Sequence, residues 1–430
     1  MTRRRADTVW MIAAFVLSGN PAVNAVPGGL EVLLPAFAVV LGLVAVARRA
    51  SVLSPRAAWI VAAFIVIQVA QCFAFDFWPI VTILGMMTRL FVAAALVAVV
   101  SDFPAVYVRA IVIIAGYCLV MWIIDQTTAA LHVDFRALFS PLEDALDVSA
   151  DHRFTGVYTF TVLEGTYRNA GIFREPGLFA GYLLLGLLWL MLDHDAATAR
   201  VRRRRILILL ATLATTFSTA GYVTLPFVLV AIGIHPRVRS TRTRSRTPIV
   251  IAALVASLTA LWLISENSTF LQDKLESQYD ELMEEGKNYE LTRFGGAVLD
   301  LEAIEERPYF GWGLHESTRF AQTPELAELA PSGGVTGWGR SFGIAGLVVF
   351  VLAISAGLRL HVGGRIGASI YLTAVVVLIA QPNTFLNYPM ILGLLFVRPP
   401  AARPAPTSAV AEPQPPPAER AIHNAGSCGA

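Results

Sequence analysis

Charged residues are scarce in this sequence. Only 15% of its 430 residues are Asp, Glu, Lys or Arg, whereas 56% are hydrophobic, and the mean hydropathy is +0.62. A soluble domain usually has about 25% charged residues, so this composition excludes an ordinary soluble globular protein. We therefore expect an all-α fold, a polytopic bundle of membrane-spanning helices.

Cysteine is also rare. The three cysteines, Cys72, Cys118 and Cys428, lie far apart, two of them in apolar runs and one in the C-terminal tail. This spacing gives neither a disulfide framework nor a metal-ligand pattern. The seven histidines are scattered as well, without the close pairs typical of zinc sites. We expect no bound metal and no cofactor.

Long apolar runs, by contrast, recur along most of the chain. A bilayer core about 30 Å thick requires roughly 20 apolar residues per helix. Twelve runs are candidate spans: 8–25, 29–47, 57–75, 79–100, 104–125, 176–192, 205–218, 220–235, 248–265, 338–359, 366–381 and 385–398. The first run, after MTRRR, resembles a signal peptide, but we expect it to be retained as the first span.

Lysine is almost absent, and arginine provides nearly all the positive charge. The arginines gather in five segments that fall on one side of a twelve-span arrangement: 3–5, 48–56, 200–205, 237–246 and 359–365. Because short basic loops face the cytoplasm, this pattern places both termini there. These clusters are best explained as topology signals, and no nucleic-acid partner is indicated.

Two long segments then face outward, at 126–175 and 266–337. In the second segment an acidic amphipathic pattern over 271–285 is followed by apolar spacing from Leu291 to Ile304, which predicts a pair of helices on the outer surface. Residues 1–398 form the membrane bundle with these loops. The Pro- and Ala-rich residues 399–430 have too little apolar content to pack, and we expect a disordered cytoplasmic tail.

Charge is concentrated where the first outer segment enters an apolar run. Arg168, Arg174 and Glu175 precede Pro176, which begins the run 176–192. Proline is favourable at the first position of a helix, and a helix N-terminus with nearby arginines suits a phosphate group. Glu175 could act as a general base or pair with an arginine, and a purely structural ion pair is an equally good interpretation.

Three further polar residues lie in or beside the second outer segment. Arg293 begins a predicted outer helix, and His315 follows the Gly-rich turn PYFGWGL. An imidazole can accept a proton near neutral pH, although a simple surface histidine is the more common case. Arg340 lies about three residues inside the predicted span 338–359, where a cation faces either the bundle interior or the lipid headgroups.

The order of these features resembles the O-antigen polymerase and O-antigen ligase superfamily of bacterial envelope glycosyltransferases. The similar segments are YRNAGIFREPGLFAGYLLL, TTFSTAGYVTL, TRFGGAVLDLEAIEERPYFGWGL and SFGIAGLVVF, within roughly residues 160–360. The resemblance implies transfer of a glycan from undecaprenyl diphosphate at the outer face of the inner membrane, by inverting displacement. It implies that Arg168 and Arg293, then Arg174 and Arg340, bind the diphosphate, with Glu175 or His315 as the base.

The segment PSGGVTGWGRSFG departs from the ligase branch of that superfamily, because it lacks a His-Asn pair before the G-x-x-G-L helix start. A polymerase of lipid-linked repeat units is therefore favoured over a ligase. Its expected partners are the undecaprenyl-diphosphate-linked glycan, membrane lipids, a flippase and a chain-length regulator. A transporter of a small anion or lipid-linked sugar is the alternative from another class, and broken helices or repeat symmetry would favour it.

Overall fold

The computed structural model divides the chain into Met1–Pro399 and Pro400–Ala430, and the described residues all belong to the first unit. They are 3–25, 29–132, 135, 152–154, 158–163, 166–192, 198–234, 293–319, 334–381 and 387–398. The predicted span 248–265, the acidic helix 271–285 and the tail 399–430 lie outside them.

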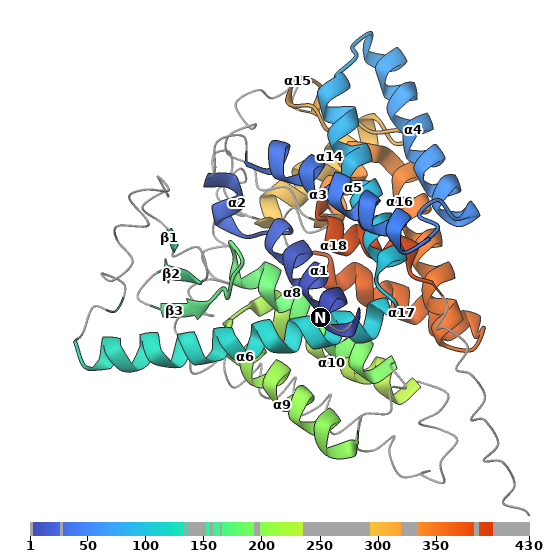
Figure 1. Cartoon of the computed structure of the whole chain (residues 1–430). Coiled ribbons are helices and arrows are strands. Elements are labelled where there is room, and N and C mark those ends of the chain that lie inside the picture. Colours follow the sequence, from blue (N-terminus) through green and yellow to red (C-terminus); the bar gives the residue numbers. More distant parts are fainter. Residues whose placement is uncertain are drawn as a thin grey trace, which may run out of the picture. The chain divides into compact units, whose positions relative to one another are not determined.

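Helices make up most of the described structure (Figure 1). The N-terminal part contains α1 (Arg3–Leu17), α2 (Pro21–Ala25), α3 (Gly29–Ala47), α4 (Pro55–Phe75), α5 (Ile80–Val99) and α6 (Phe103–Ala130). The remaining helices are α8 (Pro176–Leu192), α9 (Ala199–Thr215), α10 (Thr219–Ile234), α14 (Arg293–Glu306), α15 (Glu316–Arg319), α16 (Gly334–His361), α17 (Ile366–Ile379), α18 (Pro389–Leu392) and the 3-10 turn η5 (Gly393–Phe396).

Among the described residues, five helices are long and apolar enough to cross a membrane: α3, α4, α5, α6 and α16. Three shorter apolar helices accompany them, at Pro176–Leu192, Thr219–Ala231 and Ile366–Ile379. This composition agrees with an all-α membrane helix bundle. The count of twelve spans stays a prediction. The C-terminus of α4 and the N-terminus of α8 lie at the end of the bundle that is called the outer end below, following the predicted orientation.

Two of the predicted spans have a different local structure. The run 8–25 is divided between α1 and α2, with Ser18, Gly19 and Asn20 between them. Within 385–398 the described residues form only α18 and η5 instead of one long helix, and both are buried. In each case a glycine or proline interrupts the helix, and apolar content alone did not reveal the break.

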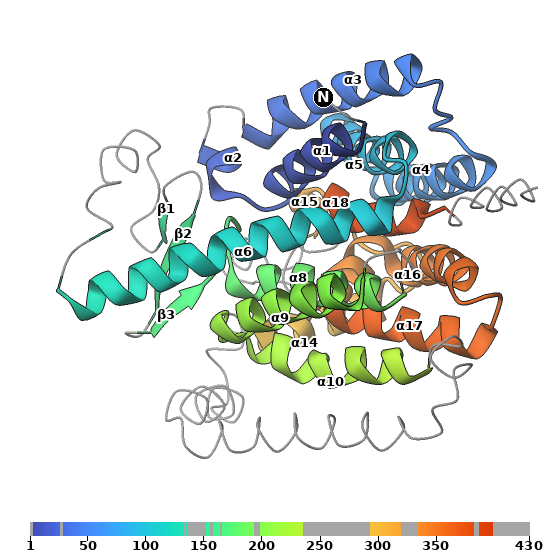
Figure 2. The same cartoon turned by 60° about the horizontal axis from the view of Figure 1, so that its bottom comes forward.

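Helix α8 lies at the centre of the packing, and all of its residues except Met191 are buried. It contacts α6, α9 and α10, and these helices lie side by side in Figure 2. Small residues allow the close approach: a Cβ added at Gly186 would lie 2.8 Å from Ile111, and one at Gly221 would lie 2.9 Å from Ala180. An evenly apolar sequence therefore forms a fully enclosed helix.

A small antiparallel sheet, which the sequence analysis did not predict, lies within the first outer segment. Strands β1 (His152–Phe154), β2 (Thr159–Leu163) and β3 (Thr166–Asn169) pair in that order, with Phe160 opposite Asn169. Strand β3 contacts α6 and α9. The sheet thus leads the chain from the end of α6 to the start of α8 and fixes where Arg168 lies.

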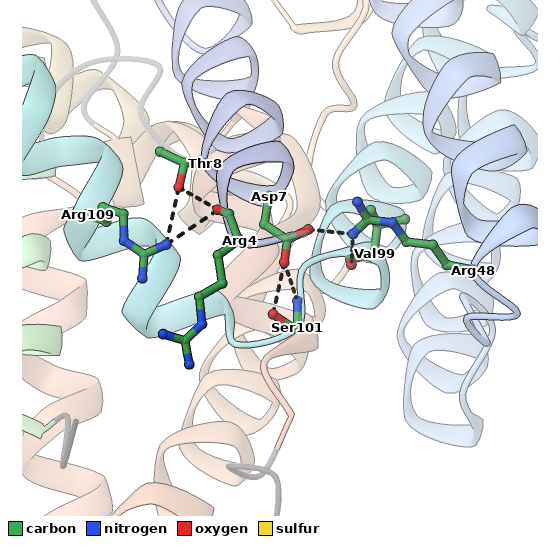
Figure 3. Close-up of polar contacts among 7 residues, drawn as sticks. All are labelled: Arg4, Asp7, Thr8, Arg48, Val99, Ser101 and Arg109. Atoms are coloured by element: carbon green, nitrogen blue, oxygen red, sulfur yellow. Dashed lines mark hydrogen bonds and ion pairs between the residues drawn. The ribbon is translucent and has the colours of Figure 1, made fainter. Parts of the chain in front are cut away.

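At the opposite, inner end, a polar cluster joins four helices (Figure 3). The buried carboxylate of Asp7 in α1 forms an ion pair with Arg48 and accepts hydrogen bonds from Ser101 Oγ at 2.9 Å and Ser101 N at 3.3 Å. Arg48, just after α3, also donates to the Val99 carbonyl of α5 at 2.8 Å. Arg109 of α6 donates to Thr8 of α1 at 3.4 Å. These contacts hold the inner ends of α1, α3, α5 and α6 together.

Candidate functional site at the outer end

The side chain of Arg168 reaches from β3 to the turn between α9 and α10. Its Nε donates to the Thr216 carbonyl at 3.3 Å and its Nη2 to the Phe217 carbonyl at 2.9 Å. A cation is favourable at a helix C-terminus, where carbonyl groups lack partners within the helix. Two of the three guanidinium nitrogens of Arg168 therefore contact backbone, which gives this residue a structural role whether or not it also binds an anion.

Asn169 is a buried polar residue that the sequence analysis did not select. Its Nδ2 donates to Thr215 Oγ1 at 2.8 Å, and its Oδ1 accepts from Gly171 N at 3.0 Å and Tyr158 Oη at 3.3 Å. The amide thus joins β3, the end of α9 and the loop that follows. The only signal in the sequence was its position between Arg168 and Gly171.

The loop from Ala170 to Glu175 carries the charged residues to the start of α8. Gly171 has φ +64°, and the Arg174 backbone N–H donates to the Gly19 carbonyl at 2.8 Å. The Arg174 side chain is exposed, Glu175 is half-buried, and α8 begins at Pro176 as predicted. Among the described residues, the guanidinium of Arg174 has no hydrogen-bond or ion-pair partner.

The first N–H groups of α8 have no partner within the helix, as at any helix start. The exposed Arg174 guanidinium and the half-buried Glu175 precede these groups directly. An anion in this position would meet an arginine and the positive end of the helix dipole. A carboxylate next to it could accept a proton.

A second polar group involves α14, α15 and α16. Arg340 is 5% exposed and Asp300 is fully buried, and Nη1 of the arginine lies 3.6 Å from Oδ1 of the aspartate. Thr336 donates to the same carboxylate at 2.9 Å, and Arg340 Nη2 donates to the Arg319 carbonyl at 2.6 Å. Arg340 therefore faces the protein interior, one of the two orientations left open above.

Arg319 extends this group. Burial lowers the pKa of Arg319, Asp300 raises it, and the neighbouring cation Arg340 lowers it again. The buried carboxylate of Asp300 therefore interacts electrostatically with both Arg319 and Arg340. Arg293 supplies the first residue of α14, but its side chain lies outside the described residues. Neither Asp300 nor Arg319 was selected from the sequence, because the ion pair joins segments far apart in the chain.

Helix α16 is interrupted at Gly343, which has φ +64° and ψ −169°. The segment 308–313 completes the hydrogen bonding at the break. Ile344 N donates to the Pro308 carbonyl at 2.7 Å, and Trp312 N donates to the Arg340 carbonyl at 2.8 Å. The predicted Gly-rich turn PYFGWGL therefore docks on α16, with Gly311 and Gly313 at positive φ.

Gln71 of α4 contacts both the docked turn and the broken part of α16. Its Nε2 donates to the Ser341 carbonyl at 2.7 Å and to the Phe310 carbonyl. Both donor positions of the amide are therefore used, which fixes the direction in which its oxygen points.

His315 follows the docked turn and lines a small pocket with residues of α4 and α5. Its Nδ1 accepts a hydrogen bond from the Ser317 backbone N–H at 3.3 Å and lies 2.8 Å from Ser317 Oγ. A neutral imidazole that accepts at Nδ1 carries its proton on Nε2. The ring of His315 packs edge-on against Phe77, with the ring centroids 5.0 Å apart.

The predicted site residues thus fall into two groups on different elements. Arg168, Arg174 and Glu175 lie on β3 and the loop before α8, whereas His315 and Arg340 lie around the α16 break. Among the described residues, no group of three or more His, Cys, Asp or Glu side chains could hold a metal ion.

The chain matches no protein-family model and no curated protein. The long apolar helices of the described residues support the class of helical membrane proteins.

Proposed function

We propose that this protein is a membrane glycosyltransferase that polymerises undecaprenyl-diphosphate-linked oligosaccharide repeat units at the outer face of a bacterial inner membrane. The observation that carries the proposal is the start of α8. There an exposed arginine and a half-buried carboxylate precede the N-terminus of a helix in which every residue except Met191 is buried. The motif resemblance, which covers the same segment, identifies the chemistry that these groups would serve.

In the proposed reaction a sugar hydroxyl of one repeat unit attacks the anomeric carbon of the growing glycan. A bond forms between the hydroxyl oxygen and that carbon, and the bond from the carbon to the diphosphate breaks. Negative charge develops on the leaving diphosphate, and fixed cations at its oxygens lower the barrier. Arg174 is the best placed cation because its guanidinium is exposed, with Arg168, Arg293 and Arg340 as further candidates.

The proton of the attacking hydroxyl needs an acceptor. Of the two candidate bases, Glu175 suits this role better, because Nδ1 of His315 already accepts a hydrogen bond from the Ser317 backbone N–H. Glu175 directly follows Arg174 in the loop before α8, so the proposed base and the proposed cation would act on the same substrate.

A transporter is a second candidate, because broken helices often form transport sites and α16 is broken at Gly343. In this chain, however, the groups exposed by the break are hydrogen-bonded to segment 308–313 and to Gln71. Groups of the protein itself therefore already make the hydrogen bonds at the break, which supports a structural role for it over substrate binding.

The proposed partners follow from the reaction. A flippase would deliver the lipid-linked units and a chain-length regulator would limit the product. Both termini would lie in the cytoplasm.

Deletion of the gene followed by complementation tests the proposal, with surface and lipid-linked glycans separated on gels. We expect the deletion strain to carry single repeat units on their normal acceptor. Wild type should restore long glycan, whereas Arg174→Ala and Glu175→Gln should reduce it at least 10-fold. Arg365→Ala is the matched control, because Arg365 is an exposed arginine at the start of α17, far along the chain from the site.

Two results would redirect the interpretation. Long glycan that accumulates on the carrier without transfer would identify a ligase. An unchanged glycan profile in the deletion strain would contradict the enzyme proposal and leave transport to be tested.

A further inference from the structure

An arginine lies in the middle of one of the helices that are long and apolar enough to cross a membrane. Arg89 is the tenth residue of α5, which runs from Ile80 to Val99. From the rise per residue of an α-helix, it lies about 14 Å from one end of α5 and about 15 Å from the other. A cation at this depth is costly in a bilayer, and such residues usually pair with a polar group or take part in function.

Arg89 faces the inside of the bundle. The exposed residues Leu84 and Phe91 are seven positions apart and mark the lipid-facing side of α5. Because each residue of an α-helix turns by about 100°, Arg89 points about 140° away from Leu84. Its neighbours on that side, Met86 and Ala93, are fully buried. The side chain therefore does not extend along the lipid-facing surface towards the headgroups.

Among the described residues, the Arg89 side chain forms no hydrogen bond or ion pair. It is half-buried, and its guanidinium nitrogens keep accessible surface. By contrast, Arg48, Arg56 and Arg340, which also reach into the bundle, contact carboxylate or carbonyl oxygens. Water can satisfy the N–H groups of Arg89 but supplies no counterion. The bundle thus contains an inward-facing positive charge that the described residues do not neutralise.

Tyr388, the residue before α18, connects Arg89 with the start of α8. Its phenol lies within electrostatic range of Arg89. A Cβ added at Gly19 would lie 3.7 Å from Cζ of Tyr388 and closer still to Leu178, in the first turn of α8. The Gly19 carbonyl accepts the backbone N–H of Arg174 at 2.8 Å. Arg89 therefore lies near the loop that carries the proposed cation and base, on its inner side.

The forked N–H groups of an arginine match two oxygens of a phosphate group. We propose that Arg89 binds a phosphate group inside the bundle, and that this phosphate belongs to the diphosphate of the lipid-linked substrate. The assignment to the substrate rests on the function proposed above. Arg89 then contacts the leaving group from the interior of the bundle, whereas Arg174 contacts it from the loop before α8.

Binding of radiolabelled farnesyl diphosphate to the full-length protein in detergent tests the proposal. This probe carries a diphosphate on a short prenyl chain. We expect wild type to bind it and Arg89→Met, which keeps a long side chain without charge, to bind at least 10-fold more weakly, since charge-assisted hydrogen bonds are lost. Arg89→Lys keeps the charge but not the fork and should fall between the two.

Arg109→Met is the matched control, because Arg109 is a half-buried arginine of the membrane helix α6 at the inner end. It should bind farnesyl diphosphate like wild type. No binding by wild type, or equal binding by wild type and Arg89→Met, would overturn the inference.

Unlabelled competitors identify the source of the phosphate. Farnesol, which lacks the diphosphate, should not displace the probe, and phosphatidylglycerol should do so only at far higher concentration than farnesyl diphosphate. Equal competition by phosphatidylglycerol would assign Arg89 to a membrane phospholipid and overturn its assignment to the substrate. Equal competition by farnesol would show that the prenyl chain alone is recognised and would overturn the phosphate site.

Thermal unfolding separates a binding residue from a structural one. Removal of a charge without a counterion should not destabilise the fold, so ligand-free Arg89→Met should unfold at the same temperature as wild type or higher. Farnesyl diphosphate should raise the midpoint of wild type more than that of the variant, because a ligand stabilises the state that binds it. A lower midpoint for the ligand-free variant would indicate a structural arginine and overturn the inference.

The two proposals fail separately. Binding of farnesyl diphosphate that depends on Arg89, combined with a normal glycan profile after gene deletion, would support the phosphate site and contradict the polymerase. Loss of glycan on deletion, combined with binding that does not depend on Arg89, would support the polymerase and overturn the role of Arg89.

Discussion

Only glycine, whose side chain is a single hydrogen atom, fits at position 171. A Cβ there would lie 2.8 Å from the ring of Phe179 and 3.1 Å from the sulfur of Cys118, and the positive φ strains any larger residue. Because this glycine turns the chain between Asn169 and Arg174, it determines how the charged loop enters α8.

Replacing Gly171 with alanine should therefore destabilise the protein. The expected loss is about 1–3 kcal/mol from overpacking, measured as a lower midpoint of thermal unfolding. Gly116→Ala is the matched control, because a Cβ at Gly116 in α6 meets nothing within 4 Å and alanine favours a helix. Equal effects of the two substitutions would contradict the crowding described at Gly171.

The buried carboxylate of Asp7 gives a prediction for pH. Burial raises its pKa, but the hydrogen bonds from Arg48 and Ser101 outweigh this effect and hold the pKa below the ordinary 3.8. In the unfolded chain Asp7 therefore binds its proton more readily than in the folded protein. Its contribution to stability is present above about pH 3.8 and is lost as the pH falls through the folded value.

The corresponding test compares wild type with Asp7→Asn in thermal unfolding between pH 3 and 7. The substitution leaves Arg48 without its ion pair and should cost about 3 kcal/mol near neutral pH, with a smaller difference at pH 3. A difference between the two proteins that stays constant over this range would rule out a titrating Asp7.

At the scale of elements, the break in α16 depends on one glycine and on a loop from elsewhere. A Cβ at Gly343 would collide with the Tyr309 carbonyl, which accepts from Ala345 N at 3.1 Å. The contact holds segment 308–315 against α16 and places His315 beside α4.

Gly343→Ala should release this segment. We expect proteolytic cleavage between residues 307 and 319 to become at least several-fold faster in the folded protein. Gly363→Ala provides the control, since Gly363 also has positive φ at +66° but a Cβ there meets nothing within 4 Å. If both variants are cleaved like wild type, the loop does not depend on the break.

The same elements show which features the sequence could predict. Helix α8 was predicted with its observed bounds, because an unbroken apolar run begins at a proline. The contact of α4 with the docked turn was not predicted, since Gln71 lies within an apolar run and its partners, Phe310 and Ser341, lie far along the chain. The Asp300–Arg340 pair was missed for the same reason. Local pattern predicts helices, whereas the site depends on contacts across the sequence.

At the scale of the whole molecule, the orientation in the membrane can be tested directly. The variants Arg174→Cys and Arg365→Cys replace exposed arginines at the outer and inner ends, in a protein where Cys428 is changed to Ser and where Cys72 and Cys118 are buried. In spheroplasts, an impermeant thiol reagent should label the first variant at once and the second only after lysis. The reverse order would invert the predicted topology.

The bonds of Gln71 also affect how the protein is made. Its two backbone partners lie 239 and 270 residues later in the chain. At a synthesis rate of about 5–20 residues per second, roughly 10–50 s separate the emergence of this glutamine from that of its partners. During this interval α4 enters the bilayer with an unsatisfied amide, so nascent chains require either retention at the insertion machinery or a temporary neighbour. Ribosome pausing before residue 341 would lengthen this vulnerable interval.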